Sequence, residues 1–159
     1  MLRLSIYLVL FGVLIAPLRV NAASLPAEGG DPGKAYKACM DAVAKPDKPS
    51  IVALCFFKDD AWLKKTNLDY FTNETFQVEV RDVYPALRLI DWKMAGGQMD
   101  GDKAKLTVEG TVVRHRVETT GDIVEYDRYP VKGIVDMRRV NGVWRYAGTQ
   151  ELEKQQPSQ

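Results

Sequence analysis

Few residues in this chain have the types and spacing that catalysis or metal binding requires. The only histidine, His115, stands between Arg114 and Arg116, and a strand histidine flanked by cations is typical of a solvated position. No group of Cys, His, Asp and Glu has the spacing of metal ligands. No glycine-rich loop between a strand and a helix suits a phosphate, and no nucleophile-elbow sequence is present. We therefore predict no catalytic residue, no metal and no cofactor.

Three acids on predicted strands, Asp91, Asp127 and Asp136, are the remaining candidates for proton transfer. A carboxyl group in an apolar cavity acquires a raised pKa, which suits it to that role. The tyrosines that would assist are Tyr84, Tyr129 and Tyr146. The predicted strand faces match Asp127 with Arg114 and turn Asp136 away from Trp144, so solvated or paired acids are the favoured interpretation. A small isomerase or dehydratase stays the alternative.

The two cysteines, Cys39 and Cys55, favour a structural disulfide. Each lies eight residues from Asp47, in the centre of a helix-breaking segment (45–49), and would sit at the same height on two antiparallel helices. Two cysteines in an exported chain most often pair. A catalytic dithiol is the alternative, but it usually has a C-x-x-C spacing, which is missing here.

The N-terminus has the layout of a secretory signal peptide. Arg3 precedes an apolar run (4–18), and small residues follow as far as Ala22, the predicted cleavage site. An uncleaved membrane anchor is the alternative, but the run is shorter than a spanning helix and contains Pro17. We predict a periplasmic or secreted bacterial protein with no stable membrane insertion after cleavage.

Loss of residues 1–22 removes Arg3 and Arg19 from 22 basic residues and none of the 21 acidic ones, so the net charge moves from +1 to −1. This balance argues against nucleic acid as a partner. The remaining length suits one domain. We predict a disordered linker at 23–30, one domain at 31–152 and a disordered tail at 153–159.

Helices are predicted first. Asp31 followed by Pro32 is a typical helix start, and Ser50 can cap a second helix after the breaker. The segment 67–84 fits either a helix or a strand, and Asp82 with the following Pro85 favours the helix.

Strands follow over 88–95, 103–117, 123–140 and 143–150. Asn141-Gly142 suits a type I′ turn, which places Met137 opposite Tyr146, Arg139 opposite Trp144 and Val135 opposite Gly148. A four-residue loop at 119–122 pairs two small or apolar sets, Ala104, Leu106 and Val108 with Met137, Val135 and Gly133. It also pairs Arg114 with Asp127 and Arg116 with Glu125. The two long strands contain glycine and proline, so we expect a strongly curved four-stranded sheet with two to three helices on one face.

One face of this sheet is apolar and would line a pocket if the helices leave the hollow unfilled. The predicted lining residues are Trp92, Met94, Val112, Tyr129, Val135, Trp144 and Tyr146. Plain core packing is the alternative. Tyr129 and Tyr146 would orient a ligand through their hydroxyls.

The order of N-terminal helices from Asp31-Pro32, the strand 101–108 and the closing 141–146 (NGVWRY) resembles the nuclear transport factor 2-like superfamily. The closing motif is similar to that of small exported bacterial members of unknown function. The resemblance implies a cone-shaped α+β fold with a cavity at its open end. The cysteine that would carry a lipid anchor in many relatives is missing.

These features predict an exported, non-enzymatic binding or accessory domain that uses a pocket or a sheet face. Its partner would be a small apolar ligand or a protein of the cell envelope. The alternatives are an isomerase of the ketosteroid-isomerase type, a membrane-anchored subunit of an envelope or secretion assembly, and a periplasmic immunity protein.

Overall fold

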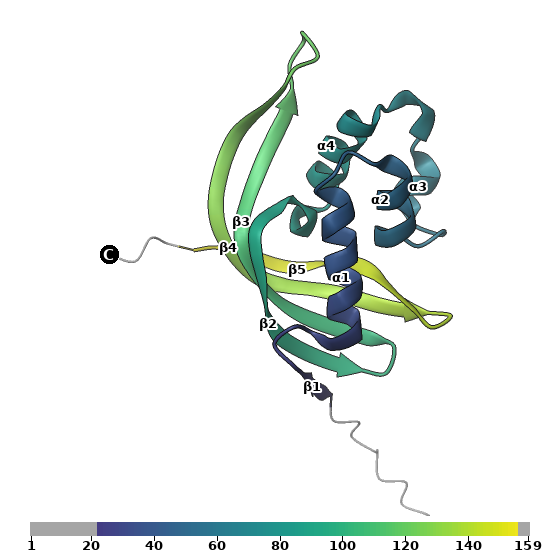
Figure 1. Ribbon diagram of the computed structural model, residues 1–159, viewed down its shortest axis with the longest axis vertical. Coiled ribbons are helices and arrows are strands. Elements are labelled where there is room, and N and C mark those ends of the chain that lie inside the picture. Colours follow the sequence, from purple (N-terminus) through teal and green to yellow (C-terminus); the bar gives the residue numbers. More distant parts are fainter. Residues whose placement is uncertain (1–21, 156–159) are drawn as a thin grey trace, which may run out of the picture.

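The computed structural model describes residues 22–155 and shows an α+β fold, with N-terminal helices packed against an antiparallel sheet (Figure 1). The helices are α1 (Gly30–Val43), α2 (Lys48–Cys55), α3 (Ala61–Lys65), η1 (Leu68–Tyr70), α4 (Asn73–Val83) and η2 (Pro85–Arg88). The strands are β1 (Ala23–Leu25), β2 (Leu89–Asp100), β3 (Lys103–Val117), β4 (Ile123–Val140) and β5 (Val143–Lys154). Within residues 22–155, no helix is long and apolar enough to cross a membrane.

The sheet has five strands in the order β1-β2-β3-β4-β5, rather than the four expected. The additional strand is β1, which pairs with the end of β2 through Ala23 and Met99. It lies in the segment 23–30, which was expected to be a disordered linker. The second helix begins at Lys48 with Asp47 as its N-cap residue, and Ser50 donates a hydrogen bond to the Asp47 carboxylate instead of capping. The segment 67–84 forms η1 and α4, which agrees with the predicted helix.

The central strand registers agree with the predicted ones. Leu106 lies opposite Val135, and Ala104 lies opposite Met137. Met137 in turn lies opposite Tyr146 across the Asn141-Gly142 turn, where both turn residues have positive φ, at 52° and 78°. The hydrophobic alternation and the turn chemistry therefore specified the same ladder.

Two predicted pairs are wrong because bulges shift the register by one residue. A bulge after Arg114 places His115 opposite Glu125, so Arg116 faces Val124 instead. A second irregularity lies between β4 and β5, and it places Thr149 opposite Val135 where Gly148 was expected. A bulge inserts one unpaired residue and resets every pair beyond it.

The sheet is not strongly curled, so the expected strongly curved sheet is corrected. Pairing of β2 with β3 stops at Val112, and pairing of β5 with β4 stops at Val131. Beyond these points β3 and β4 continue alone as a two-stranded ribbon (113–117 and 123–130), which rises away from the other strands in Figure 1. Bending is thus confined to local bulges and to this ribbon, because no third strand forces the ribbon to curl with the sheet.

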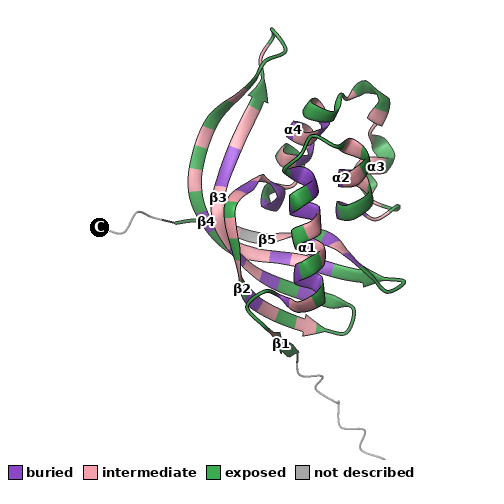
Figure 2. Cartoon of the chain, in the orientation of Figure 1, coloured by how far each residue is buried: buried purple, intermediate pink, exposed green. Residues whose placement is uncertain are grey.

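A single core lies between α1 and the sheet. Tyr36 and Val43 on α1, and Leu106 and Val135 on the sheet, are almost fully buried. Figure 2 shows this buried layer along α1 and on the strands that face it. Trp144 and Leu106 lie in the same core, as the predicted faces required.

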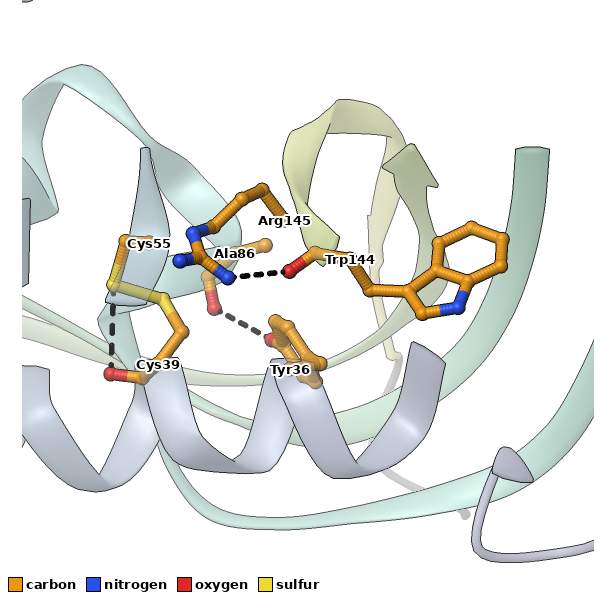
Figure 3. The surroundings of a disulfide bond; sticks show 6 residues. All are labelled: Tyr36, Cys39, Cys55, Ala86, Trp144 and Arg145. Atoms are coloured by element: carbon orange, nitrogen blue, oxygen red, sulfur yellow. Dashed lines mark hydrogen bonds between the residues drawn. A yellow bond between two sulfur atoms is a disulfide. The ribbon is translucent and has the colours of Figure 1, made fainter. Parts of the chain in front are cut away.

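The disulfide between Cys39 and Cys55 joins α1 to α2, with the two Cα atoms 4.8 Å apart (Figure 3). Both cysteines are fully buried. The predicted bridge is therefore confirmed, and it holds α2 against the helix that crosses the sheet.

Side chains from α4 satisfy the carboxyl end of α1. Gln77 Nε2 and Arg81 donate to the Val43 carbonyl oxygen, at 2.6 and 3.1 Å. Burial lowers the pKa of the Arg81 guanidinium. Arg88 in turn donates to the carbonyls of Arg81 and Asp82 at the end of α4. Cations at helix carboxyl ends are favoured by the dipole and by the unpaired carbonyls, so these arginines fix the helical layer.

Candidate functional site

Two open clefts lie on either side of the contact between Tyr84 and Tyr146, where the helical layer meets β5. The first, here called the tyrosine cleft, has a volume of about 470 Å³. Its walls are Val83, Tyr84, Pro85, Arg88, Val112, Tyr129, Tyr146, Gly148, Thr149, Gln150 and Leu152. The second, here called the acidic cleft, has a volume of about 330 Å³. Its walls are Phe57, Asp59, Asp60, Ala61, Tyr84, Arg138, Tyr146 and Ala147.

The two shared tyrosines come from different layers. Tyr84 caps α4 and donates its backbone N–H to the Val80 carbonyl, and Pro85 then turns the chain into η2. Tyr146 projects from β5 at the position opposite Met137. Their rings meet edge to face, with centroids 5.8 Å apart, which is a favourable aromatic geometry.

Both tyrosine hydroxyls are held by hydrogen bonds. Tyr84 Oη donates to Asp60 Oδ1 at 3.0 Å, and the Tyr146 hydroxyl lies 2.6 Å from Thr149 Oγ1. Burial raises the pKa of Tyr146 to about 12, and it also raises the pKa of Tyr84. Both hydroxyls therefore stay protonated at neutral pH, so they can orient a ligand as neutral groups and are poorly suited to act as bases.

Asp60 links the two clefts. Its Oδ1 atom accepts from the backbone N–H groups of Trp62 and Leu63, at 3.0 and 3.1 Å, as well as from Tyr84. These three bonds make Asp60 the N-cap of α3 and fix its carboxylate beside the tyrosine pair. Arg88, by contrast, lines the tyrosine cleft but has donors directed to the end of α4 and an ion pair with Asp82.

Three of the predicted pocket residues line the tyrosine cleft: Val112, Tyr129 and Tyr146. The structure places the other four elsewhere. Val135 and Trp144 are buried in the core, and Met94 is packed against it. Trp92 lies edge to face on Tyr36, with ring centroids 5.2 Å apart, and lines a different depression near the end of α1. The apolar sheet face is therefore mostly core, and its cleft lies at one end of it.

The candidate acids do not enter the tyrosine cleft. Asp136 lines a depression together with Lys105, and Asp127 lies opposite Arg114 in the ladder. Asp91 is exposed and has a left-handed backbone, with φ 48°. Within the described range, no polar or charged residue is buried. The same residues contain no group of three or more His, Cys, Asp or Glu that could hold a metal ion.

His115 lies on the ribbon and is partly buried there. Burial lowers its pKa, and the Arg81 charge on α4 adds to this effect, while Glu125 and Asp82 oppose it. Its Nδ1 atom is buried without a hydrogen-bond partner among residues 22–155. The histidine thus belongs to the contact between the ribbon and α4, and lies outside the walls of both clefts.

The pocket prediction missed Thr149, Leu152 and Asp60. Thr149 and Leu152 entered the cleft because of the register shift on β5. Asp60 has only a weak sequence signal, which is its position as an N-cap before Ala61.

Comparison with known proteins gave no match: no family model, no curated protein and no solved structure resembles this chain significantly.

Proposed function

We propose that this chain is an exported, non-enzymatic binding or accessory domain whose ligand occupies the tyrosine cleft. In fold, we propose a shallow form of the nuclear transport factor 2-like architecture. Helices that precede an antiparallel meander support this relation, as does α1 lying across the sheet (Figure 1). The sheet lacks the strong curl of a cone, so the cleft opens at the edge of the helical layer.

The observation that carries the binding proposal is the convergence of three tyrosines from separate elements. Tyr84, Tyr129 and Tyr146 come from the end of α4, from β4 and from β5. Val112 and Leu152 add apolar walls. Binding sites typically combine apolar walls with a few fixed polar groups. The ligand class that fits is a small, uncharged, mainly apolar ring compound with one polar substituent.

Export is supported by the N-terminal sequence pattern and by the buried disulfide, because disulfides persist in oxidising compartments. Residues 1–21 lie outside the described residues. Mass spectrometry of the protein recovered from the periplasm or medium should find Ala23 as the first residue. An intact Met1 start in the membrane fraction would instead support the anchored-subunit alternative.

The isomerase alternative depends on a carboxyl group buried in a cavity. Among the described residues no acid has that environment, so no observation favours this alternative.

Binding can be tested by two-dimensional NMR with a library of small aromatic and alicyclic compounds. Hits should shift the resonances of Gly148, Thr149 and Leu152. Tyr129→Ala, which removes a half-buried wall, should weaken a hit about tenfold, the loss expected for one aromatic contact of ~1.4 kcal/mol. Tyr146→Phe should weaken only ligands with a polar substituent.

Tyr70→Phe is the matched control, since Tyr70 is 85% exposed and lies outside both clefts. The proposal is rejected if no compound shifts the cleft resonances, or if hits bind equally well to Tyr129→Ala protein that retains its fold by circular dichroism.

A further inference from the structure

The acidic cleft has the composition of a site for a planar organic cation. Aromatic walls come from Phe57, Tyr84 and Tyr146, and carboxylates come from Asp59 and Asp60. Aromatic faces attract cations through the ring quadrupole, and carboxylates add direct charge attraction. A volume of about 330 Å³ is at the low end for ligand pockets. The cleft therefore suits one side-chain-sized group.

A cation of this chain already occupies part of that cleft. The guanidinium carbon of Arg138 lies over the Phe57 ring, 4.4 Å from its centroid. In the part of the chain that the structure describes, Arg138 forms no ion pair with Asp59 or Asp60 within 4 Å. The aromatic wall thus holds a guanidinium group, while the two carboxylates beside it remain without a charged partner.

The carboxylate of Asp60 is also fixed in direction. All three of its recorded hydrogen bonds, from Trp62 N, Leu63 N and Tyr84 Oη, go to Oδ1. Oδ2 accepts none of them. A guanidinium group is planar and presents donors in a fixed fork, so it can stack on a ring and donate to a carboxylate at its edge.

From this geometry we propose that the acidic cleft binds an arginine side chain of a partner polypeptide. The incoming guanidinium group stacks in the aromatic wall in place of Arg138 and donates to Asp59 and to Asp60 Oδ2. Arg138 acts as an internal competitor, which keeps the cleft filled when the partner is absent. The inference adds a second subsite to the proposed binding function through the shared Tyr84–Tyr146 wall, and it does not require a ligand in the tyrosine cleft.

The test uses N-acetyl-L-arginine methylamide and its neutral isostere, N-acetyl-L-citrulline methylamide, titrated into the millimolar range and followed by NMR. The arginine compound should shift resonances of Phe57, Asp59 and Ala61, and the citrulline compound should bind several times more weakly. Added salt should weaken only the arginine compound, because exposed charge attraction is screened.

Two substitutions give opposite expected results. Asp59→Asn should weaken arginine binding about threefold, on the scale of one exposed charge pair. Arg138→Gln should strengthen it by a similar factor of about three, because the competing cation is gone. Asp69→Asn, an exposed acid of η1 outside the cleft, should change nothing.

Equal binding of the citrulline compound would overturn the inference. So would an affinity for the arginine compound that neither Asp59→Asn nor Arg138→Gln changes, or the lack of any shift at residues 57–61. A failure of the tyrosine-cleft proposal is separate from these outcomes, since its hits are read at Gly148, Thr149 and Leu152.

Discussion

At the residue scale, hydroxyl groups of tyrosines connect the helical layer to its surroundings. Tyr36 Oη donates to the Ala86 carbonyl oxygen at 3.0 Å and so ties α1 to η2. Burial raises the pKa of Tyr36. The Tyr84 hydroxyl ties the end of α4 to Asp60 in the same way. Such bonds matter most in the interior, where water cannot replace a lost partner.

Replacing Tyr36 by Phe keeps the buried ring and removes only the hydroxyl. We expect the free energy of unfolding to fall by about 1–2 kcal/mol, because the Ala86 carbonyl loses a buried donor. Urea denaturation followed by circular dichroism measures the change. Tyr70→Phe, at an exposed position, should leave the midpoint unchanged. An equal effect of the two substitutions would contradict this role of the hydroxyl.

His115 predicts a pH dependence of stability. Its pKa is lowered in the folded protein, first by burial and then by Arg81, although Glu125 and Asp82 oppose this and Arg128 adds to it. The unfolded chain therefore binds a proton more readily, so this contribution to stability is complete above the ordinary value near 6.5 and is lost as the pH falls below it.

In His115→Gln protein this pH dependence should vanish. The unfolding free energy of the original chain should fall more than that of the variant between about pH 7.5 and about pH 5, which spans the ordinary histidine pKa. Parallel urea titrations at several pH values measure the difference. Identical pH profiles would show that His115 does not titrate in contact with α4.

At the element scale, the helical layer is held by one covalent bond and by side-chain caps. The disulfide fixes α2 to α1, and Lys48 Nζ donates to the carbonyls of Leu68 and Phe71, at 2.8 and 3.0 Å, which holds the η1 segment against α2. These contacts hold α3 and Asp60 where the two clefts need them. The elements that form the clefts therefore depend on the cross-linked helix pair.

Removing the disulfide should destabilise the protein substantially. The bond joins cysteines separated by 16 residues, and closing a loop of that size is worth about 3 kcal/mol in the chain-entropy model. We expect Cys39→Ala/Cys55→Ala protein to lose about that much unfolding free energy. Reduction of the original chain by dithiothreitol under denaturing conditions should give the same loss. A change well below 1 kcal/mol would mean that α2 is held mainly by packing.

At the scale of the whole molecule, one core joins both layers. The same cluster contains Phe76 of α4, Cys39 of α1, Val108 of β3 and Tyr146 of β5. Neither layer has a separate core among the described residues, since the sheet buries one face against the helices. Small domains with a single core usually unfold in one step.

We therefore expect a single cooperative unfolding transition. The tryptophans lie in α3 (Trp62), β2 (Trp92) and β5 (Trp144), so their fluorescence samples the helical layer and strands on two sides of the sheet. Urea curves from tryptophan fluorescence and from far-ultraviolet circular dichroism should coincide. Separate midpoints would show that the helical layer unfolds independently of the sheet.

The sequence by itself determined the fold class, the central strand pairing and the disulfide. Each depends on a local signal: alternation in 103–112, the positive φ values that Asn141-Gly142 readily adopts, and the symmetric spacing of Cys39 and Cys55 about a helix breaker. Such signals lie within a short segment and survive in almost any tertiary context.

Only the tertiary structure decided the bulges, the modest curl of the sheet and the position of the clefts. A bulge after Arg114 or before Thr149 leaves the hydrophobic alternation intact on either side, so the sequence pattern does not reveal it. The pairing of Asp60 with Tyr84, and of Tyr84 with Tyr146, joins segments far apart in the chain. Those contacts exist because the helical layer packs against one end of the sheet, and packing between distant segments has no local signature.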